Sequence, residues 1–227
     1  MANRHYGRIG DVWKHLPLAE ILRIERPGEY WESPPLIGSR YRSVLAECPG
    51  FYPGSAEIAM RVLGRETQFL FCDTDPESVQ SLRDSARELG IPRVRCENRD
   101  GQVELWNELA HLDAARASRL FAHLDPWSCL TPSPENGRTG LDLFRELGRK
   151  GARVLGEIRL DIITDPAPER NPGVFGCGIY CANLSSAAID SADRLGKELS
   201  HIYETASFPW GESGRLGYRS HVVQRAE

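Results

Sequence analysis

The chain has 227 residues, a formal net charge of −4 and 41% hydrophobic residues, which excludes intrinsic disorder as its main state. No apolar run approaches the roughly 20 residues that a membrane helix needs, and we expect no signal peptide because charged side chains occur throughout residues 1–16. Six cysteines are too few for a secreted disulfide scaffold. We therefore expect a cytoplasmic protein with one domain over residues 1–227 and no membrane partner.

The amino-terminal segment is predicted to form a helix that Asp11 caps and Pro17 kinks in its second turn. Its apolar positions include Val12, Leu16, Ala19 and Leu22. Lys14 and His15 have two interpretations. They can be solvated helix charges, or Lys14 can hold a phosphate or carboxylate beside an active site as a point charge.

Short apolar runs then alternate with amphipathic stretches. The strand candidates are residues 69–72, 93–97, 120–124, 152–160, 178–184 and 218–223, and the helix candidates are 76–89, 141–147 and 185–203. Asp75 is predicted to cap the first of these helices and Gly148 to end the second. The loop candidates are residues 131–139, 165–173 and 208–217. This alternation predicts an α/β fold with a mostly parallel sheet and helices on both faces, which binds ligands at the carboxyl ends of its strands.

Acidic residues follow four successive strand candidates. They are Glu32, Asp73, Asp100 and Asp125. In a nucleotide-binding sheet, an acid after the second strand can accept both ribose hydroxyls, and an acid after the third can accept from an adenine amino group. The alternative is helix capping, which needs no ligand. The ordered series favours a nucleoside-type cofactor.

The tetrapeptide Asp125-Pro126-Trp127-Ser128 resembles the Asp-Pro-Pro-Tyr motif of amino methyltransferases. An adenine amino nitrogen is a poor nucleophile because its lone pair is delocalised into the ring. A carboxylate and a backbone carbonyl that accept its two N–H groups localise the lone pair, and an aromatic ring holds the base by stacking. Here Trp127 occupies the second proline position and Ser128 the aromatic position.

Several segments together resemble the RlmJ family of 23S rRNA adenine-N6 methyltransferases. Residues 5–15 are similar to that family's His-Ala-Gly-Asn-His-Ala-Asp-Val-Leu-Lys-His, and residues 30–41 to its segment around the glycine-rich loop. Tyr52-Pro53-Gly54-Ser55 matches its Tyr-Pro-Gly-Ser, and residues 176–179 are similar to its Gly-Ser-Gly-Met. The resemblance implies a Rossmann-like class I methyltransferase fold that uses S-adenosylmethionine to methylate adenine in RNA, or less readily in DNA.

The resemblance also implies roles for individual residues, and no metal. The catalytic residues would be Lys14, Asp125, Pro126 and Trp127. The cofactor-binding residues would be Glu32, Ser33, Gly38, Ser55, Asp73, Asp100, Gly101 and Asp125. The substrate-binding residues would be His5, Lys14, Trp127 and Ser128.

The chain departs from the family in two places, and these departures keep other functions open. The loop over residues 32–38 has one glycine and two prolines, and the family's long insertion is nearly absent between Tyr41 and Tyr52. The first alternative is an S-adenosylmethionine-dependent enzyme acting on a small amine or nucleoside. The second is a binding or regulatory module on the same fold that lacks catalysis.

Two further patterns have both a functional and a structural interpretation. Basic residues gather between residues 138 and 159, where they could track a phosphate backbone or form a solvated helix with opposite charges. They are Arg138, Arg145, Arg149, Lys150, Arg153 and Arg159. Cys177 and Cys181 are spaced for one face of a strand, but no second pair completes a zinc site.

Overall fold

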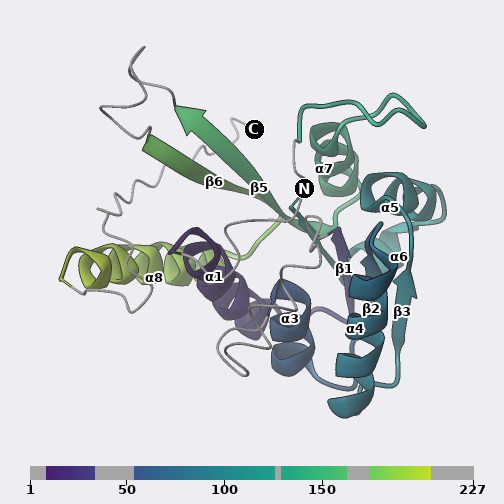
Figure 1. The fold of residues 1–227 in the computed structure, drawn as a ribbon, viewed down its shortest axis with the longest axis horizontal. Coiled ribbons are helices and arrows are strands. Elements are labelled where there is room, and N and C mark those ends of the chain that lie inside the picture. The colour runs from purple at the N-terminus through teal and green to yellow at the C-terminus, as the bar shows by residue number, and fades with distance from the viewer. Residues whose placement is uncertain (1–8, 34–53, 126–128, 163–173, 206–227) are drawn as a thin grey trace.

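The computed structural model describes residues 9–33, 54–125, 129–162 and 174–205. Its centre is a six-stranded sheet in the order β3-β2-β1-β4-β5-β6 (Figure 1). The strands are β1 (Glu29–Ser33), β2 (Gln68–Cys72), β3 (Val94–Glu97), β4 (Leu120–Leu124), β5 (Arg153–Ile162) and β6 (Val174–Ala182). All neighbours pair in parallel except β5 and β6.

The helices cover both faces of this sheet. They are α1 (Ile9–Glu25), α3 (Ser55–Leu63), α4 (Pro76–Glu88), α5 (Gly101–Ala110), α6 (Ala114–Ala117), α7 (Gly140–Arg149) and α8 (Ser186–Thr205). The predicted Rossmann-like α/β fold is therefore confirmed. Among the described residues, no helix combines the length and apolar character needed to cross a membrane.

Two hydrophobic cores form because successive side chains of a strand point to opposite faces. On β1, Tyr30 packs with Leu22 of α1 and Met60 of α3 in one core. Trp31, the next residue, packs with Leu105 of α5 and Leu143 of α7 in the other. Both faces of β2 and β4 are buried, which explains why these two strands are almost uninterrupted apolar runs.

The helix ends follow local chemistry, with some differences from prediction. Asp75 caps α4 by accepting from the Glu77 N–H at 3.0 Å, as predicted. By contrast, Asp11 lies inside α1 and does not precede it, whereas Pro17 is internal to that helix as expected. Gly148 does not end its helix, since α7 continues to Arg149 and the positive φ of 93° falls at Gly151. The expected strand at 218–223 lies outside the described residues.

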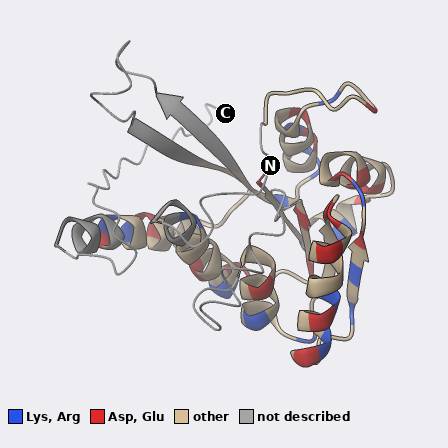
Figure 2. Cartoon of the chain, viewed as in Figure 1, with Lys and Arg blue, Asp and Glu red and all other residues tan. Residues whose placement is uncertain are grey.

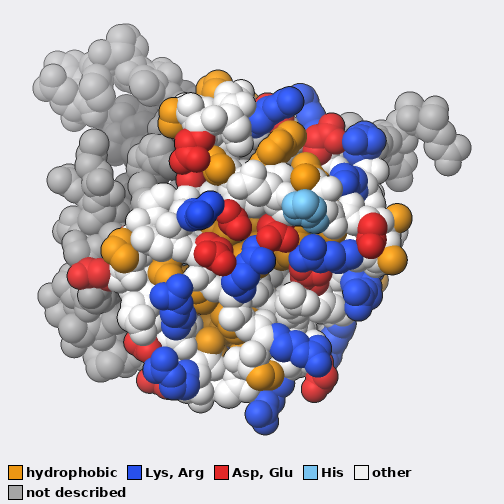
Figure 3. Space-filling model, turned by 90° about the vertical axis from the view of Figure 1, so that its right-hand side faces the viewer, with side chains coloured by type: hydrophobic (Ala, Val, Ile, Leu, Met, Phe, Trp, Pro, Cys, Tyr) orange, Lys and Arg blue, Asp and Glu red, His pale blue; other side chains and the backbone are white. Residues whose placement is uncertain are grey.

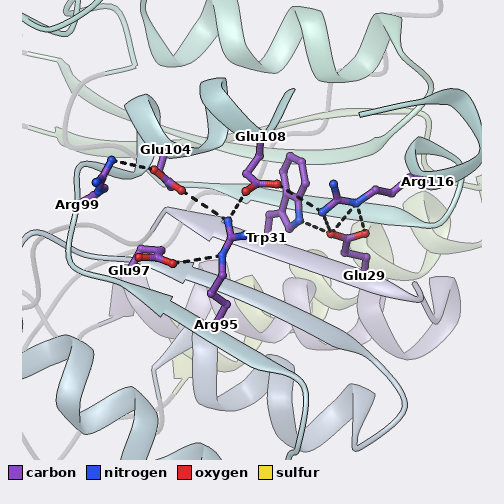
Figure 4. A network of polar contacts seen from close by, with 8 residues as sticks. All are labelled: Glu29, Trp31, Arg95, Glu97, Arg99, Glu104, Glu108 and Arg116. Carbon is purple, nitrogen blue, oxygen red and sulfur yellow. Dashed lines mark hydrogen bonds and ion pairs between the residues drawn. The ribbon is translucent and has the colours of Figure 1, made fainter. Parts of the chain in front are cut away.

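A network of charged side chains holds α5 on the sheet (Figure 4). Arg95 of β3 pairs with Glu108 and, at 3.6 Å, with Glu104, both on α5. Arg116 donates to Glu29 of β1 at 2.8 Å and lies over the Trp31 ring at 5.2 Å. The helix α5 is thereby fixed relative to β1 and β3.

Charges of both signs are interspersed at this edge of the sheet. Figure 2 shows acidic and basic residues alternating along α4, and Figure 3 shows the same mixture over the face that this edge presents. Arg83 of α4 donates to the Cys96 carbonyl of β3 at 2.7 Å. This carbonyl of the edge strand therefore already accepts a hydrogen bond. Such features discourage pairing with another chain.

Candidate active site

The order of the strands reverses between β1 and β4. The chain runs outward from β1 through β2 to β3 and then returns to place β4 on the other side of β1. Just past the end of β4, the Asp125 N–H donates to the Ser33 carbonyl at 3.3 Å. In open parallel sheets, ligands bind outside the carboxyl ends of the strands at this reversal.

Asp125 follows β4 at this point and meets Lys14 of α1. The Lys14 Nζ lies 2.8 Å from Asp125 Oδ2, and the two side chains are 13% and 12% exposed. The packing of Leu18 and Leu22 into the core holds α1 over the sheet. The structure thus brings together two predicted catalytic residues that are 111 positions apart in the chain.

Glu32 differs from its expected position. It is the fourth residue of β1 rather than a residue following the strand, and its side chain is fully buried. Its carboxylate accepts from the Tyr30 hydroxyl at 2.9 Å and from the Ser55 hydroxyl, and His123 Nδ1 lies 3.4 Å away. Glu32 therefore ties the first residue of α3 to the sheet beneath the site.

Asp73 and Asp100 follow β2 and β3 and organise the turns there. Asp73 is 3% exposed and accepts from the Asp75 N–H at 2.9 Å, while Asn98 donates to its carbonyl. Asp100 caps α5 by accepting from the Gln102 N–H at 2.8 Å. Asp100 Oδ1 therefore caps the helix, as the alternative interpretation expects. The predicted contact of Asp100 with a cofactor stays a prediction.

Gly101 packs directly against the end of β1. A Cβ at this position would lie 2.2 Å from Ser33 Oγ and 2.5 Å from Ser33 Cβ, which is closer than real Cβ atoms come, and 3.0 Å from Ser33 Cα. Only glycine lets the first turn of α5 approach β1 this closely. Ser33, Gly101, Asp100 and Asp125 are therefore gathered around one end of the sheet.

Sequence reasoning missed two residues beside this end of the sheet. His123 lies on β4, paired in register with Glu32, and is fully buried. Tyr180 of β6 crosses β5 at Gly156, where a Cβ would meet the ring at 2.2 Å, and it contacts Phe144 of α7 with ring centroids 4.5 Å apart. The only sequence signals were one histidine in an apolar run and one glycine in a strand.

Solved structures with a similar arrangement were found, whereas no protein-family model and no curated protein matches the sequence. Protein LPL1258 from Legionella pneumophila str. Philadelphia 1, described under family-model DUF519, is 16% identical with a TM-score of 0.51, over 86% of this chain and 93% of that chain. A methyltransferase from Geobacter sulfurreducens is 14% identical with a TM-score of 0.41, over 75% of this chain and 78% of that chain. The likeness to LPL1258 shows the fold alone.

Several predicted site residues lie outside the described ranges. They are His5, Gly38, Pro126, Trp127 and Ser128. Within the part of the chain that the structure describes, no three His, Cys, Asp or Glu side chains form a group able to hold a metal ion.

Three of the predicted basic residues bond to carboxylates or backbone carbonyls of the chain itself. Arg149 pairs with Glu146 one turn earlier on α7. Lys150 donates to the Leu109 and Leu112 carbonyls, at 2.9 and 2.7 Å. Arg153 pairs with Glu25 of α1 at 2.7 Å. For these three residues, the structural interpretation accounts for the charge.

Proposed function

We propose that the chain is an S-adenosylmethionine-dependent methyltransferase that methylates an amino group, with adenine in RNA or DNA as the leading substrate class. The observation that carries this proposal is the Lys14–Asp125 pair at the strand reversal, with Oδ2 and Nζ 2.8 Å apart. It combines the carboxylate that amine activation needs with the place where the fold binds ligands. The sequence resemblance to the RlmJ family supports the adenine substrate.

The residues around the carboxyl ends fit a nucleoside cofactor by their chemistry. Carboxylates are the natural acceptors for ribose hydroxyls, and the buried Asp73 provides one after the second strand. Gly101 lies close against Ser33, so the chain presents backbone and no side chain at the start of α5 beside the end of β1. S-adenosylmethionine, when bound, supplies an already activated sulfonium methyl group.

Asp125 would orient the substrate amine by accepting one of its N–H groups, while the Pro126 carbonyl accepts the other. Both contacts localise the nitrogen lone pair and aim it for in-line attack. Lys14 places a positive charge 2.8 Å from Asp125 Oδ2 and holds that oxygen in an ion pair. Lys14 also fixes the direction in which the second Asp125 oxygen faces.

A small amine or nucleoside is the second candidate substrate, and the basic residues favour it. Arg149 pairs with Glu146 and Arg153 pairs with Glu25, while Lys150 donates to backbone carbonyls. A nucleic-acid enzyme needs cations that stay available to phosphates. The two candidates separate when RNA oligonucleotides and small amines are compared as methyl acceptors.

The test of the proposed function is the variant Asp125→Ala, compared with Asp84→Ala on the exposed surface of α4. Calorimetry should show S-adenosylmethionine binding to the wild type and to both variants. Turnover of the best acceptor should fall by roughly a hundredfold or more in Asp125→Ala, because a group aimed at the reacting centre is lost. If turnover survives, the role given to Asp125 is wrong. If the wild type binds neither S-adenosylmethionine nor S-adenosylhomocysteine, the binding-module alternative replaces the enzyme.

A further inference from the structure

Gln102 carries a buried polar atom that the described part of the chain leaves without a partner. Its side-chain carbonyl oxygen Oε1 is inaccessible to solvent and makes no hydrogen bond within the described residues. A buried acceptor of this kind is costly and rare, because it has given up its water without a replacement. The Gln102 backbone N–H, by contrast, is bound by Asp100.

The position of Gln102 follows from its two chain neighbours. Asp100 caps α5, and Gly101 fits against Ser33 at the end of β1. Gln102 is therefore the second residue of α5 and lies directly beside the carboxyl ends of β1 and β3. The charged network between α5 and the sheet holds the helix in this place (Figure 4).

The face of α5 that Gln102 occupies is also defined. Side chains four residues apart share one face of a helix, so Gln102 lies on the side of Trp106. The Arg138 guanidinium lies 5.0 Å from the Trp106 ring centroid, and Arg138 belongs to the segment between β4 and α7. Gln102 is thus on the side of α5 that faces the segment following β4, between the loops that follow β3 and β4.

We propose that Gln102 reads the adenine base of the nucleoside cofactor through its side-chain amide. Adenine presents an N–H donor beside a ring-nitrogen acceptor, and a carboxamide offers the complementary acceptor and donor on one rigid group. The base would supply the hydrogen bond that Oε1 lacks. This inference rests on the proposed function and revises one expectation, because it moves recognition of the adenine amino group from Asp100 to Gln102.

The test measures how strongly the protein distinguishes two ligands that differ at one amino group. Calorimetry would compare S-adenosylhomocysteine with its analogue carrying hydrogen in place of the 6-amino group. Wild type should prefer S-adenosylhomocysteine about tenfold, which corresponds to about 1.4 kcal/mol. In Gln102→Leu the preference should disappear, because no acceptor remains for the amino group.

Gln80→Leu is the matched control, since it removes a side-chain amide from an exposed position on α4 that bonds Asp84. It should keep the full tenfold preference. A retained preference in Gln102→Leu would overturn the inference while leaving the proposed function standing, and so would equal binding of both ligands by the wild type. Failure of the wild type to bind either ligand would overturn the proposed function, and the inference with it.

Discussion

The contact between Gly101 and Ser33 makes the site sensitive to a single methyl group. A Cβ at Gly101 would overlap the Ser33 side chain and press on its Cα, 3.0 Å away. Because Ser33 Cα belongs to the central strand, α5 must move instead. We expect Gly101→Ala to cost about 1–3 kcal/mol of stability, the usual range for overpacking, and to lower the midpoint of thermal unfolding. Cofactor affinity should fall with it.

A second glycine provides the control for this prediction. A Cβ at Gly28 would meet only the Arg119 side chain, at 3.6 Å, so Gly28→Ala should change the unfolding midpoint little. Adding Ser33→Gly to Gly101→Ala removes the two closest atoms and should restore part of the lost stability. Equal midpoints for Gly101→Ala and Gly28→Ala would contradict the steric argument.

The site could be predicted from the sequence where the fold itself fixes a residue's place. Asp73, Asp100 and Asp125 each follow a strand, and the carboxyl ends of parallel strands meet at one edge of the sheet. Glu32 was expected to follow its strand, but β1 continues through Glu32 to Ser33. The contacts of Glu32 with Ser55 and His123 could not be foreseen, since they join three distant segments through residue types that occur everywhere.

At the scale of elements, α1 carries Lys14 and is held against α8 by a carboxylate. Glu20 of α1 accepts from Arg23 on its own helix and from the Ser191 hydroxyl of α8 at 2.7 Å. These hydrogen bonds, with Arg23 the larger cause, lower the pKa of Glu20 to about 2. A carboxyl whose pKa is lower in the folded state stabilises the fold above its unfolded pKa.

We therefore expect Glu20→Gln to lower the unfolding midpoint at pH 7, and the deficit to shrink as the pH falls from about 4.5 towards about 2. The midpoint should fall by roughly 2–4 °C for each kcal/mol lost. Thermal melts at stepped pH would measure this. Glu57→Gln is the control, because Glu57 pairs with Arg61 within α3. A Glu20→Gln deficit that stays constant down to pH 2 would exclude the linkage.

The elements were predictable where local signals agree and not where packing decides. Residues 120–124 and α4 have a clear apolar pattern and clear end signals, and the structure places them as expected. α3 and α5 were not predicted. Gly54 precedes α3 without a side-chain cap, and α5 begins with Gly101, a poor helix former that the contact with Ser33 requires. Tertiary contact, which a local pattern does not carry, marks the start of α3, and at α5 it requires the glycine that follows the Asp100 cap.

At the scale of the whole molecule, the alternation of strands and helices predicts a parallel sheet but not the order of its strands. The place of β4 beside β1 and the antiparallel direction of β6 are pairings between separate segments of the chain, which no local pattern specifies. That order is what brings Asp125 and Lys14 together and sets Asp73 and Asp100 on the other side of β1. The function of the site is thus a property of the complete sheet.

A ligand bound at the edge of the complete sheet should stabilise the entire fold. S-adenosylhomocysteine at one hundred times its dissociation constant should add about 2.7 kcal/mol, which raises the unfolding midpoint by roughly 5–10 °C for a chain of this size. Asp73→Asn should lose much of this shift, because the buried carboxylate after β2 is the predicted acceptor for the ribose hydroxyls. Asp84→Asn, on the exposed side of α4, should keep the shift, and Asp125→Ala should keep most of it, since Asp125 is assigned to the acceptor amine. An identical shift in Asp73→Asn and wild type would place the cofactor elsewhere on the molecule.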